Sequence, residues 1–265
     1  MDIKEVQNIN FVANRHPWEL ARVKIIENFV QKVSKQKDFT KISIIDIGCG
    51  DLFVLKTIRK HFQFSEFFGV DVALTAENLA NLENSLSETN IKVFNNLNDI
   101  SAKSNNMVIV LLNDVIEHIA DDKTFLLHLQ KHPSINSDSV FIITVPAFQG
   151  LFSSHDLFLE HYRRYTNNQL VTLLKETNFS ITSKGYFFAS LLLPRLFVLL
   201  KEKIFGTKKI SNNSGTDLTN WKGSKFVAHF IKNILLLDYF FTSFFLKLKI
   251  KIPGLSTFVI CKKSV

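Results

Sequence analysis

The stretch KISIIDIGCGDLFVLKTI places two glycines between two apolar runs, where a strand would turn into a helix to meet a ligand. Gly48 and Gly50 let backbone N–H groups approach that ligand closely at the start of the helix. A dinucleotide-binding turn needs a third glycine at position 53, which is Phe53 here. A phosphate loop needs lysine after the second glycine, where Asp51 would instead repel phosphate. The turn therefore predicts a ligand without a di- or triphosphate.

A second acid follows the next apolar run, EFFGVD, which ends at Asp71. A carboxylate at the end of this strand can accept hydrogen bonds from both hydroxyls of a ribose. Taken alone, Asp71 could instead cap a helix that begins near Ala73. Together with Asp46 and the glycine turn, Asp71 predicts a site for a nucleoside with a non-phosphate tail, which S-adenosylmethionine would fill.

Three segments in order resemble motifs of the class I S-adenosylmethionine-dependent methyltransferases: IIDIGCGD, FFGVDVAL and VIVLLNDVIEHIADD. The resemblance covers about residues 40–180 and implies that Asp46, Gly48 and Gly50 line the methionine part of the cofactor. It places Asp71 at the ribose, Asn96 near the adenine and Asn113 near the amino group. The chain departs from the family at NNLND, where an acid is usual after the third strand. The residues predicted to bind the cofactor are Asp46, Gly48, Cys49, Gly50, Asp71, Val72, Asn96 and Asn113, with Cys49 as a small filler of the turn.

Strands and helices alternate along the first two thirds of the chain, which predicts an α/β fold with a largely parallel sheet. Apolar runs without strict alternation, such as MVIVLL and VFIITV, suit strands that are buried on both faces. The expected strands are 42–47, 66–71, 91–95, 107–112, 139–145, 179–188 and 255–263. The helices expected between the first five of these strands are 52–62, 73–87 and 121–131. The resemblance implies a Rossmann-like seven-stranded sheet with an antiparallel last strand and helices on both faces.

We predict a single domain in which an N-terminal entry helix (1–40) precedes a core sheet formed by 41–187 and 253–265. In the segment NRHPWELAR, Trp18 and Arg22 lie one helical turn apart and could close the cofactor pocket, with Arg22 near the cofactor carboxylate. The alternative is a surface helix with a buried tryptophan.

The loop SSHDLFLEHYRRYT follows the fifth expected strand, at the sheet edge where open α/β folds bind ligands. If the methyl acceptor is a hydroxyl, a neutral histidine beside it can remove the proton. We predict His155, next to Asp156, as this base and His118 as the second candidate. Arg164 or Arg163 could bind an anionic group on the acceptor, and one of the two is expected in a structural ion pair. The loop is similar to that of a methyltransferase subset with an HD…H-RRYT segment, many of which act on cell-envelope or lipid-linked substrates.

Residues 188–252 form an apolar and basic insertion that does not fit a simple α/β repeat. It could lie in a membrane interface, cap a hydrophobic acceptor pocket, or form core or dimer contacts. The formal net charge of +8 favours anionic partners, although a lysine-rich coding style would also produce it.

The sequence thus predicts transfer of a methyl group from S-adenosylmethionine to a small or lipid-linked acceptor, with an oxygen nucleophile expected. The alternatives are an RNA methyltransferase, a non-catalytic cofactor-fold interaction protein and an oxidoreductase. The basic residues interleave with apolar ones and form no stacking surface for nucleic acid. The two cysteines have no metal-ligand spacing, so no metal site is predicted. The sequence shows no signal peptide and no apolar run long enough to span a membrane, which predicts a cytoplasmic protein. In one alternative this protein associates peripherally with the membrane.

Overall fold

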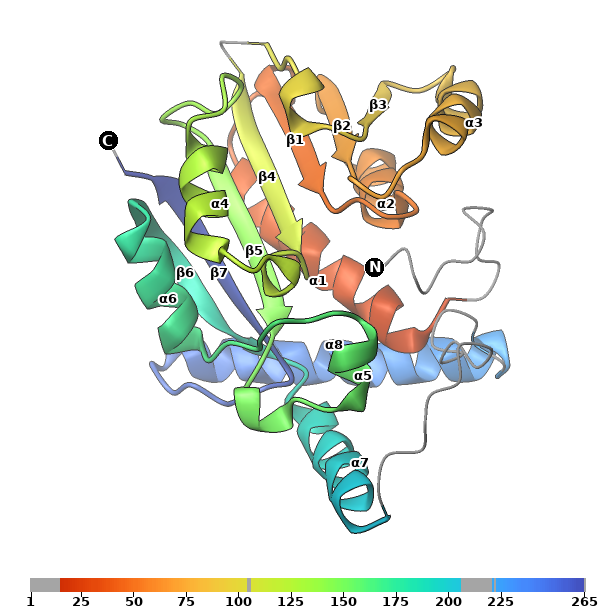
Figure 1. Ribbon diagram of the computed structural model, residues 1–265, viewed down its shortest axis with the longest axis vertical. Coiled ribbons are helices and arrows are strands. Elements are labelled where there is room, and N and C mark those ends of the chain that lie inside the picture. The colour runs from red at the N-terminus through yellow and green to blue at the C-terminus, as the bar shows by residue number, and fades with distance from the viewer. Residues whose placement is uncertain (1–14, 104–105, 206–220, 222, 265) are drawn as a thin grey trace.

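The computed structural model describes residues 15–103, 106–205, 221 and 223–264, and their strands form one sheet in the order β3-β2-β1-β4-β5-β7-β6 (Figure 1). The strands are β1 Ile42–Ile47, β2 Glu66–Val70, β3 Ile91–Phe94, β4 Met107–Asn113, β5 Val140–Pro146, β6 Phe179–Phe187 and β7 Ser256–Lys263. Strand β7 runs antiparallel to both of its neighbours, β5 and β6, and the first five strands pair in parallel. The predicted α/β fold with a seven-stranded sheet and an antiparallel last strand is confirmed.

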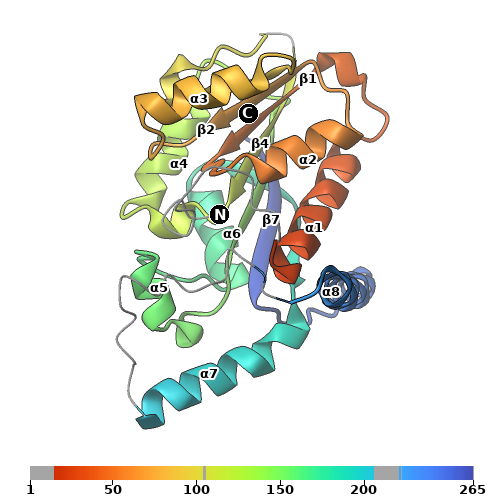
Figure 2. The same cartoon turned by 90° about the vertical axis from the view of Figure 1, so that its right-hand side faces the viewer.

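Helices cover both faces of this sheet, which explains the continuous apolar runs of its central strands (Figure 2). One face packs against α1, α2 and α3, and the other packs against α4 and α6. These helices are α1 Pro17–Ser34, α2 Phe53–His61, α3 Ala76–Leu86, α4 Asp122–Gln130 and α6 Asn167–Glu176. In β1 every residue is buried, so both faces of the strand contribute to the core.

Helix α3 begins three residues later than expected, because the chain first makes a turn at the end of β2. Thr75 caps the helix through a capping box with Asn78, in which the Asn78 N–H donates to the Thr75 hydroxyl. Thr166 and Gln169 form the corresponding box at the start of α6. The loop after β5 holds a short helix that the sequence pattern did not indicate, α5 Ser154–Phe158.

Residues 188–252 contribute two helices, α7 Leu192–Phe205 and α8 Lys225–Lys247. Helix α8 packs along α1 and β6, where Phe29 and Tyr239 meet edge to face with centroids 6.0 Å apart. Helix α7 extends away from the sheet at the bottom of Figure 1. Within the described part of the chain, no helix has both the length and the apolarity to span a membrane.

The division into an entry helix, a core and an insertion stays a prediction. Residues 1–14 of the entry segment and 206–220 of the insertion lie outside the described part of the chain.

Candidate active site

The glycine turn connects β1 to α2 in a conformation that favours glycine. Gly48 and Gly50 have φ angles of +71° and +53°. A Cβ on Gly48 would lie 2.8 Å from Cγ2 of Val115, so a larger residue would be both strained and crowded. The N–H groups of Gly48 and Cys49 donate to the Val70 carbonyl at 2.8 and 3.1 Å, which ties the turn to the end of β2. The thiol of Cys49 is buried, and burial raises its pKa well above the usual value, as expected of a filler.

Asp71 lies directly after β2 and also faces the glycine turn. Its carboxylate accepts hydrogen bonds from the N–H of Gly50 at 3.0 Å and from the N–H of Ala73 at 3.1 Å. Asp71 therefore shapes the turn, while α3 has its own cap at Thr75. The adjacent Val72 side chain is 88% exposed, although it is apolar. Both residues stand at the edge where the sequence predicts the nucleoside.

Asp46 and Asn113 lie buried at the ends of the adjacent strands β1 and β4. Burial, together with the nearby carboxylate of Asp71, raises the pKa of Asp46 to about 7. The buried Nδ2 of Asn113 has no hydrogen-bond partner among the described residues. Both side chains line a hollow of about 40 Å³. A cationic amino group could pair with Asp46 here, and the assignment of Asp46 and Asn113 to the methionine end of the cofactor stays a prediction.

Asn96 is exposed just after β3, and its Oδ1 accepts a hydrogen bond from the N–H of Asn98 at 3.0 Å. This contact caps a turn, and the predicted place of Asn96 near an adenine stays a prediction.

Helix α1 covers the hollow through Trp18 and Arg22, which both line it. Arg22 is only 8% exposed and forms an ion pair with Asp114. Its Nη2 also donates to the Thr144 hydroxyl at 3.0 Å. Arg22 thereby connects α1 to the ends of β4 and β5. The alternative of a surface helix with a buried tryptophan does not account for these contacts.

A second cavity of about 260 Å³ adjoins this hollow and shares Trp18 and Arg22 with it. Three histidines and two further arginines line it together with apolar side chains. The histidines and arginines are His118, His155, His161, Arg164 and Arg195, and the apolar side chains include Leu159, Phe188, Leu191 and Leu255. The arrangement can therefore hold an acceptor beside the cofactor pocket.

Asp156 organises the loop that borders this cavity. Its side chain is fully buried and accepts a hydrogen bond from Nε of Arg164 at 2.7 Å and one from Nη2 of Arg195 at 2.9 Å. The third partner is Nδ1 of His161, at 2.9 Å. The sequence placed Asp156 beside His155, whereas the folded chain pairs its carboxylate with His161. These contacts hold the pKa of Asp156 below its usual value despite its burial.

Sequence reasoning missed Arg195 as a residue of the site, because it lies 39 residues after Asp156 in the insertion. No local pattern brings an arginine of α7 to a loop after β5. Arg163, in contrast, donates to Asp122 at 2.8 Å, which is the structural ion pair expected for one of the two adjacent arginines.

His155 and His118 both line the cavity, as predicted for candidate bases. Burial lowers the pKa of His155, and the positive charge of Arg195 lowers it further. A lowered pKa favours the neutral imidazole, which is the form that accepts a proton. The ring of His118 packs edge to face on His161, with centroids 4.5 Å apart.

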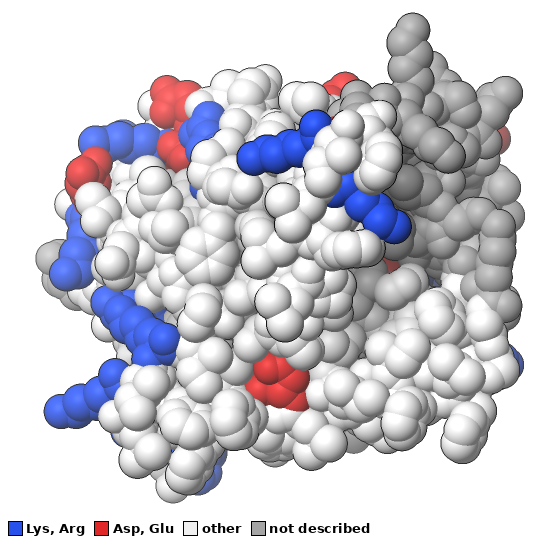
Figure 3. Space-filling view, turned by 90° about the horizontal axis from the view of Figure 1, so that it is seen from below, with Lys and Arg blue, Asp and Glu red and all other residues white. Residues whose placement is uncertain are grey.

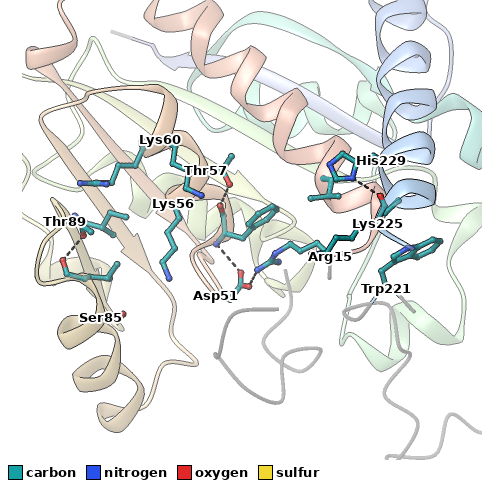
Figure 4. A pocket seen from close by; sticks show the side chains of 16 residues that line it. Arg15, Asp51, Lys56, Thr57, Lys60, Ser85, Thr89, Trp221, Lys225 and His229 are labelled. Atoms are coloured by element: carbon teal, nitrogen blue, oxygen red, sulfur yellow. Dashed lines mark hydrogen bonds and ion pairs between the residues drawn. The ribbon is translucent and has the colours of Figure 1, made fainter. Parts of the chain in front are cut away.

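A larger hollow of about 500 Å³ lies between α2, α3 and the start of α8 (Figure 4). Arg15 reaches across it to pair with Asp51 and stacks over the Phe53 ring at 3.8 Å. Lys56, Lys60 and Lys225 contribute further positive charge to its lining, and none of the residues predicted for cofactor binding or catalysis belongs to it.

Comparison with family models matches residues 18–184 to a family described as a methyltransferase domain. The match covers more than half of the chain. The chain belongs to this methyltransferase family. The prediction of a class I methyltransferase that uses S-adenosylmethionine is confirmed. Comparison with curated protein sequences found no match.

Solved structures with the same fold include several methyltransferases. The plantazolicin methyltransferase, in complex with a triazolic desmethyl analogue and S-adenosylhomocysteine, is 17% identical with a TM-score of 0.53, over 93% of this methyltransferase and 86% of that chain. The 1,6-didemethyltoxoflavin N1-methyltransferase of Burkholderia thailandensis is 12% identical with a TM-score of 0.52, and the match covers 92% of this chain and 78% of that chain. The phosphoethanolamine N-methyltransferase 2 of Haemonchus contortus is 14% identical with a TM-score of 0.53, and the match covers 91% of this chain and 53% of that chain.

Proposed function

We propose that this methyltransferase transfers the methyl group of S-adenosylmethionine to an oxygen nucleophile on a small or lipid-linked acceptor that carries an anionic group. The observation that carries the proposal is the cavity of about 260 Å³ beside the methionine pocket, which combines three histidines, three arginines and an apolar wall.

The proposed cofactor contacts use the ends of strands β1, β2 and β4. Asp46 and Asn113 would hold the amino group, the turn of Gly48 to Gly50 would face the methionine backbone, and Asp71 would bind the ribose. Val72 offers an exposed apolar surface beside the ribose site. The sulfonium supplies the activated methyl group, so the protein has to position the acceptor and exclude water.

His155 is the proposed base for the acceptor hydroxyl. It lines the cavity, and its lowered pKa favours the neutral form. Removal of the hydroxyl proton by a positioned base contributes about 10²–10⁴-fold to the rate.

Arg195 is the proposed contact for the anionic group. Its Nη2 donates to Asp156, to the Ser153 hydroxyl and to the Leu151 carbonyl, whereas its Nη1 makes no hydrogen bond in the described ranges. The predicted contact, Arg164, uses Nε and Nη2 on Asp156 and Nη1 on the Ala147 carbonyl. A guanidinium with a remaining donor binds carboxylate or phosphate well. The apolar wall beside it suits a hydrocarbon part of the same acceptor.

The exposed faces of α7 and α8 support association with an anionic membrane surface. Apolar side chains recur at helical spacing along each helix and are 56–81% exposed: Leu193, Phe197, Leu200 and Ile204 on α7, and Phe226, Phe230, Leu237, Phe241 and Phe244 on α8. The view from below shows few acidic side chains on this face and basic ones toward its edges (Figure 3). Such a combination is typical of helices that lie in a membrane interface. Since Arg195 and Leu191 line the acceptor cavity, this surface adjoins the proposed acceptor site.

Calorimetry with S-adenosylmethionine tests the cofactor half of the proposal. Asp71→Ala removes the hydrogen bonds to Gly50 and Ala73 and the proposed ribose contact, so affinity should fall at least about a hundredfold. Unchanged affinity would remove Asp71 from the ribose site. For the acceptor, a lipid extract is incubated with enzyme and labelled cofactor. A product heavier by one methyl group identifies the acceptor class, and a product methylated on nitrogen or carbon would contradict the oxygen nucleophile.

A further inference from the structure

Three residues with metal-binding side chains converge at the edge of the acceptor cavity. Glu117 and His118 lie in the short turn Ile116–His118 after β4, and His161 follows α5. One ligand atom of each lies within 4.8 Å of those of the other two. The N–H of Tyr162 donates to the Glu117 carbonyl at 2.8 Å and so fixes the two segments side by side.

Glu117 is the unusual member of this cluster. Its side chain is 0% exposed, and neither carboxylate oxygen has a hydrogen-bond partner within the residues that the structure describes. Arg22, whose positive charge acts on this carboxylate, is paired with Asp114. An isolated buried carboxylate costs several kcal/mol. A cation bound at this point would remove that cost.

The partner of His161 orients its ring for ligation. Because Nδ1 is hydrogen-bonded to Asp156 at 2.9 Å, Nε2 is the nitrogen left to bind an ion. Asp156 is itself fixed by Arg164 and Arg195. A carboxylate behind a histidine is the usual support of a metal-binding imidazole, because it fixes the tautomer and raises the basicity.

We propose that Glu117, His118 and His161 bind a divalent transition-metal ion. Two imidazoles and one carboxylate favour ions such as Mn²⁺, Co²⁺ or Zn²⁺ over Mg²⁺ and Ca²⁺, which prefer oxygen ligands. Sequence spacing predicted no metal site, because the two sequence segments are separated by more than forty residues.

The role of the ion rests on the proposed function. His118 and His161 line the acceptor cavity, so an ion bound between them has its open positions toward the acceptor. There it would bind the acceptor oxygen and lower the pKa of that hydroxyl. His118 is then a ligand, and His155 remains the base.

The test measures ion binding directly on the full chain. After treatment with a chelator, the protein is titrated calorimetrically with MnCl₂ and ZnCl₂, and the visible absorption of added Co²⁺ reports imidazole ligation. We expect one ion per chain. Glu117→Gln and His161→Asn should each weaken binding at least about a hundredfold, and Asp156→Asn about tenfold or more through the His161 ring. The controls are Glu83→Gln and His128→Asn, which change exposed residues on α3 and α4 and should bind as the unaltered protein does.

Absence of stoichiometric binding to the unaltered protein, or wild-type affinity in Glu117→Gln and His161→Asn, would overturn the metal site. If a variant does not fold, the Co²⁺ spectrum of the unaltered protein tests the metal site instead. A spectrum without imidazole ligation would also overturn the proposed site. Calorimetry with S-adenosylmethionine on the chelator-treated protein separates the two proposals. Cofactor binding without ion binding removes only the metal site, and ion binding without cofactor binding removes only the proposed function.

Discussion

At the scale of single residues, Asp46 has the clearest electrostatic consequence. Burial raises its pKa to about 7, so the carboxyl is partly protonated in the free protein at neutral pH. Only the ionised form can pair with the cofactor's amino group. Affinity for S-adenosylmethionine should therefore rise about fivefold between pH 6 and pH 7 and about tenfold between pH 6 and pH 8, and level off above pH 8. Calorimetry across this range measures the effect, and Asp46→Asn should bind more weakly without the pH dependence. Equal affinity at pH 6 and pH 8 in the unaltered protein would contradict the assignment.

The pKa of His155 is shifted in the other direction from that of Asp46, because burial lowers it. The base form persists below the usual histidine pKa, so the rate should stay level as pH falls to about 6.5 and decline only below it. His155→Ala should reduce kcat about 10²–10⁴-fold while leaving the dissociation constant of the cofactor unchanged. Single-turnover rates and calorimetry measure the two quantities. A wild-type rate in the variant would remove His155 as the base.

At the scale of elements, Asp156 holds together three segments that are separate in the sequence. It accepts hydrogen bonds from Ser153 at the start of α5, from Arg164 before α6 and from Arg195 on α7. Asp156→Ala leaves the buried guanidinium of Arg164 and the partly buried one of Arg195 without their anion, so the free energy of unfolding should fall by about 3–5 kcal/mol. Denaturant unfolding measures it.

The matched control for Asp156 is Arg163→Gln. The ion pair of Arg163 with Asp122 is partly exposed, with 30% and 14% of the side chains accessible. Its removal should cost about 1 kcal/mol or less. Equal losses for the two variants would show that Asp156 does not connect these elements.

At the scale of the whole molecule, the apolar faces of α7 and α8 predict binding to anionic vesicles. The full chain should sediment with vesicles that contain phosphatidylglycerol, less with pure phosphatidylcholine, and less as salt increases. Phe230→Glu together with Phe241→Glu should weaken binding at least tenfold, since both rings are about 60% exposed. Phe39→Glu, a change of a partly exposed phenylalanine before β1, should have little effect. If vesicle binding depends neither on the lipid charge nor on the double substitution, α7 and α8 do not form a membrane-binding surface.

The sequence alone was sufficient for the fold and the family. Strands buried on both faces favour uninterrupted apolar runs, and positive φ angles at Gly48 and Gly50 favour glycine. These constraints are local and visible along the chain. The order of glycine turn, ribose acid and fourth-strand motif then predicted the class of cofactor. The predicted cofactor residues after β1, β2 and β4 meet at one sheet edge because the carboxyl ends of parallel strands meet there.

Only the tertiary structure decided which side chains share the acceptor site. Asp156 follows His155 in the sequence but pairs with His161, and its second guanidinium comes from Arg195 in the insertion. Glu117 reads as an ordinary helical acid in IEHI, yet folding buries it against a histidine from another loop. Local patterns encode backbone geometry and burial. Contacts between distant segments depend on how the elements pack, which no spacing along one chain specifies.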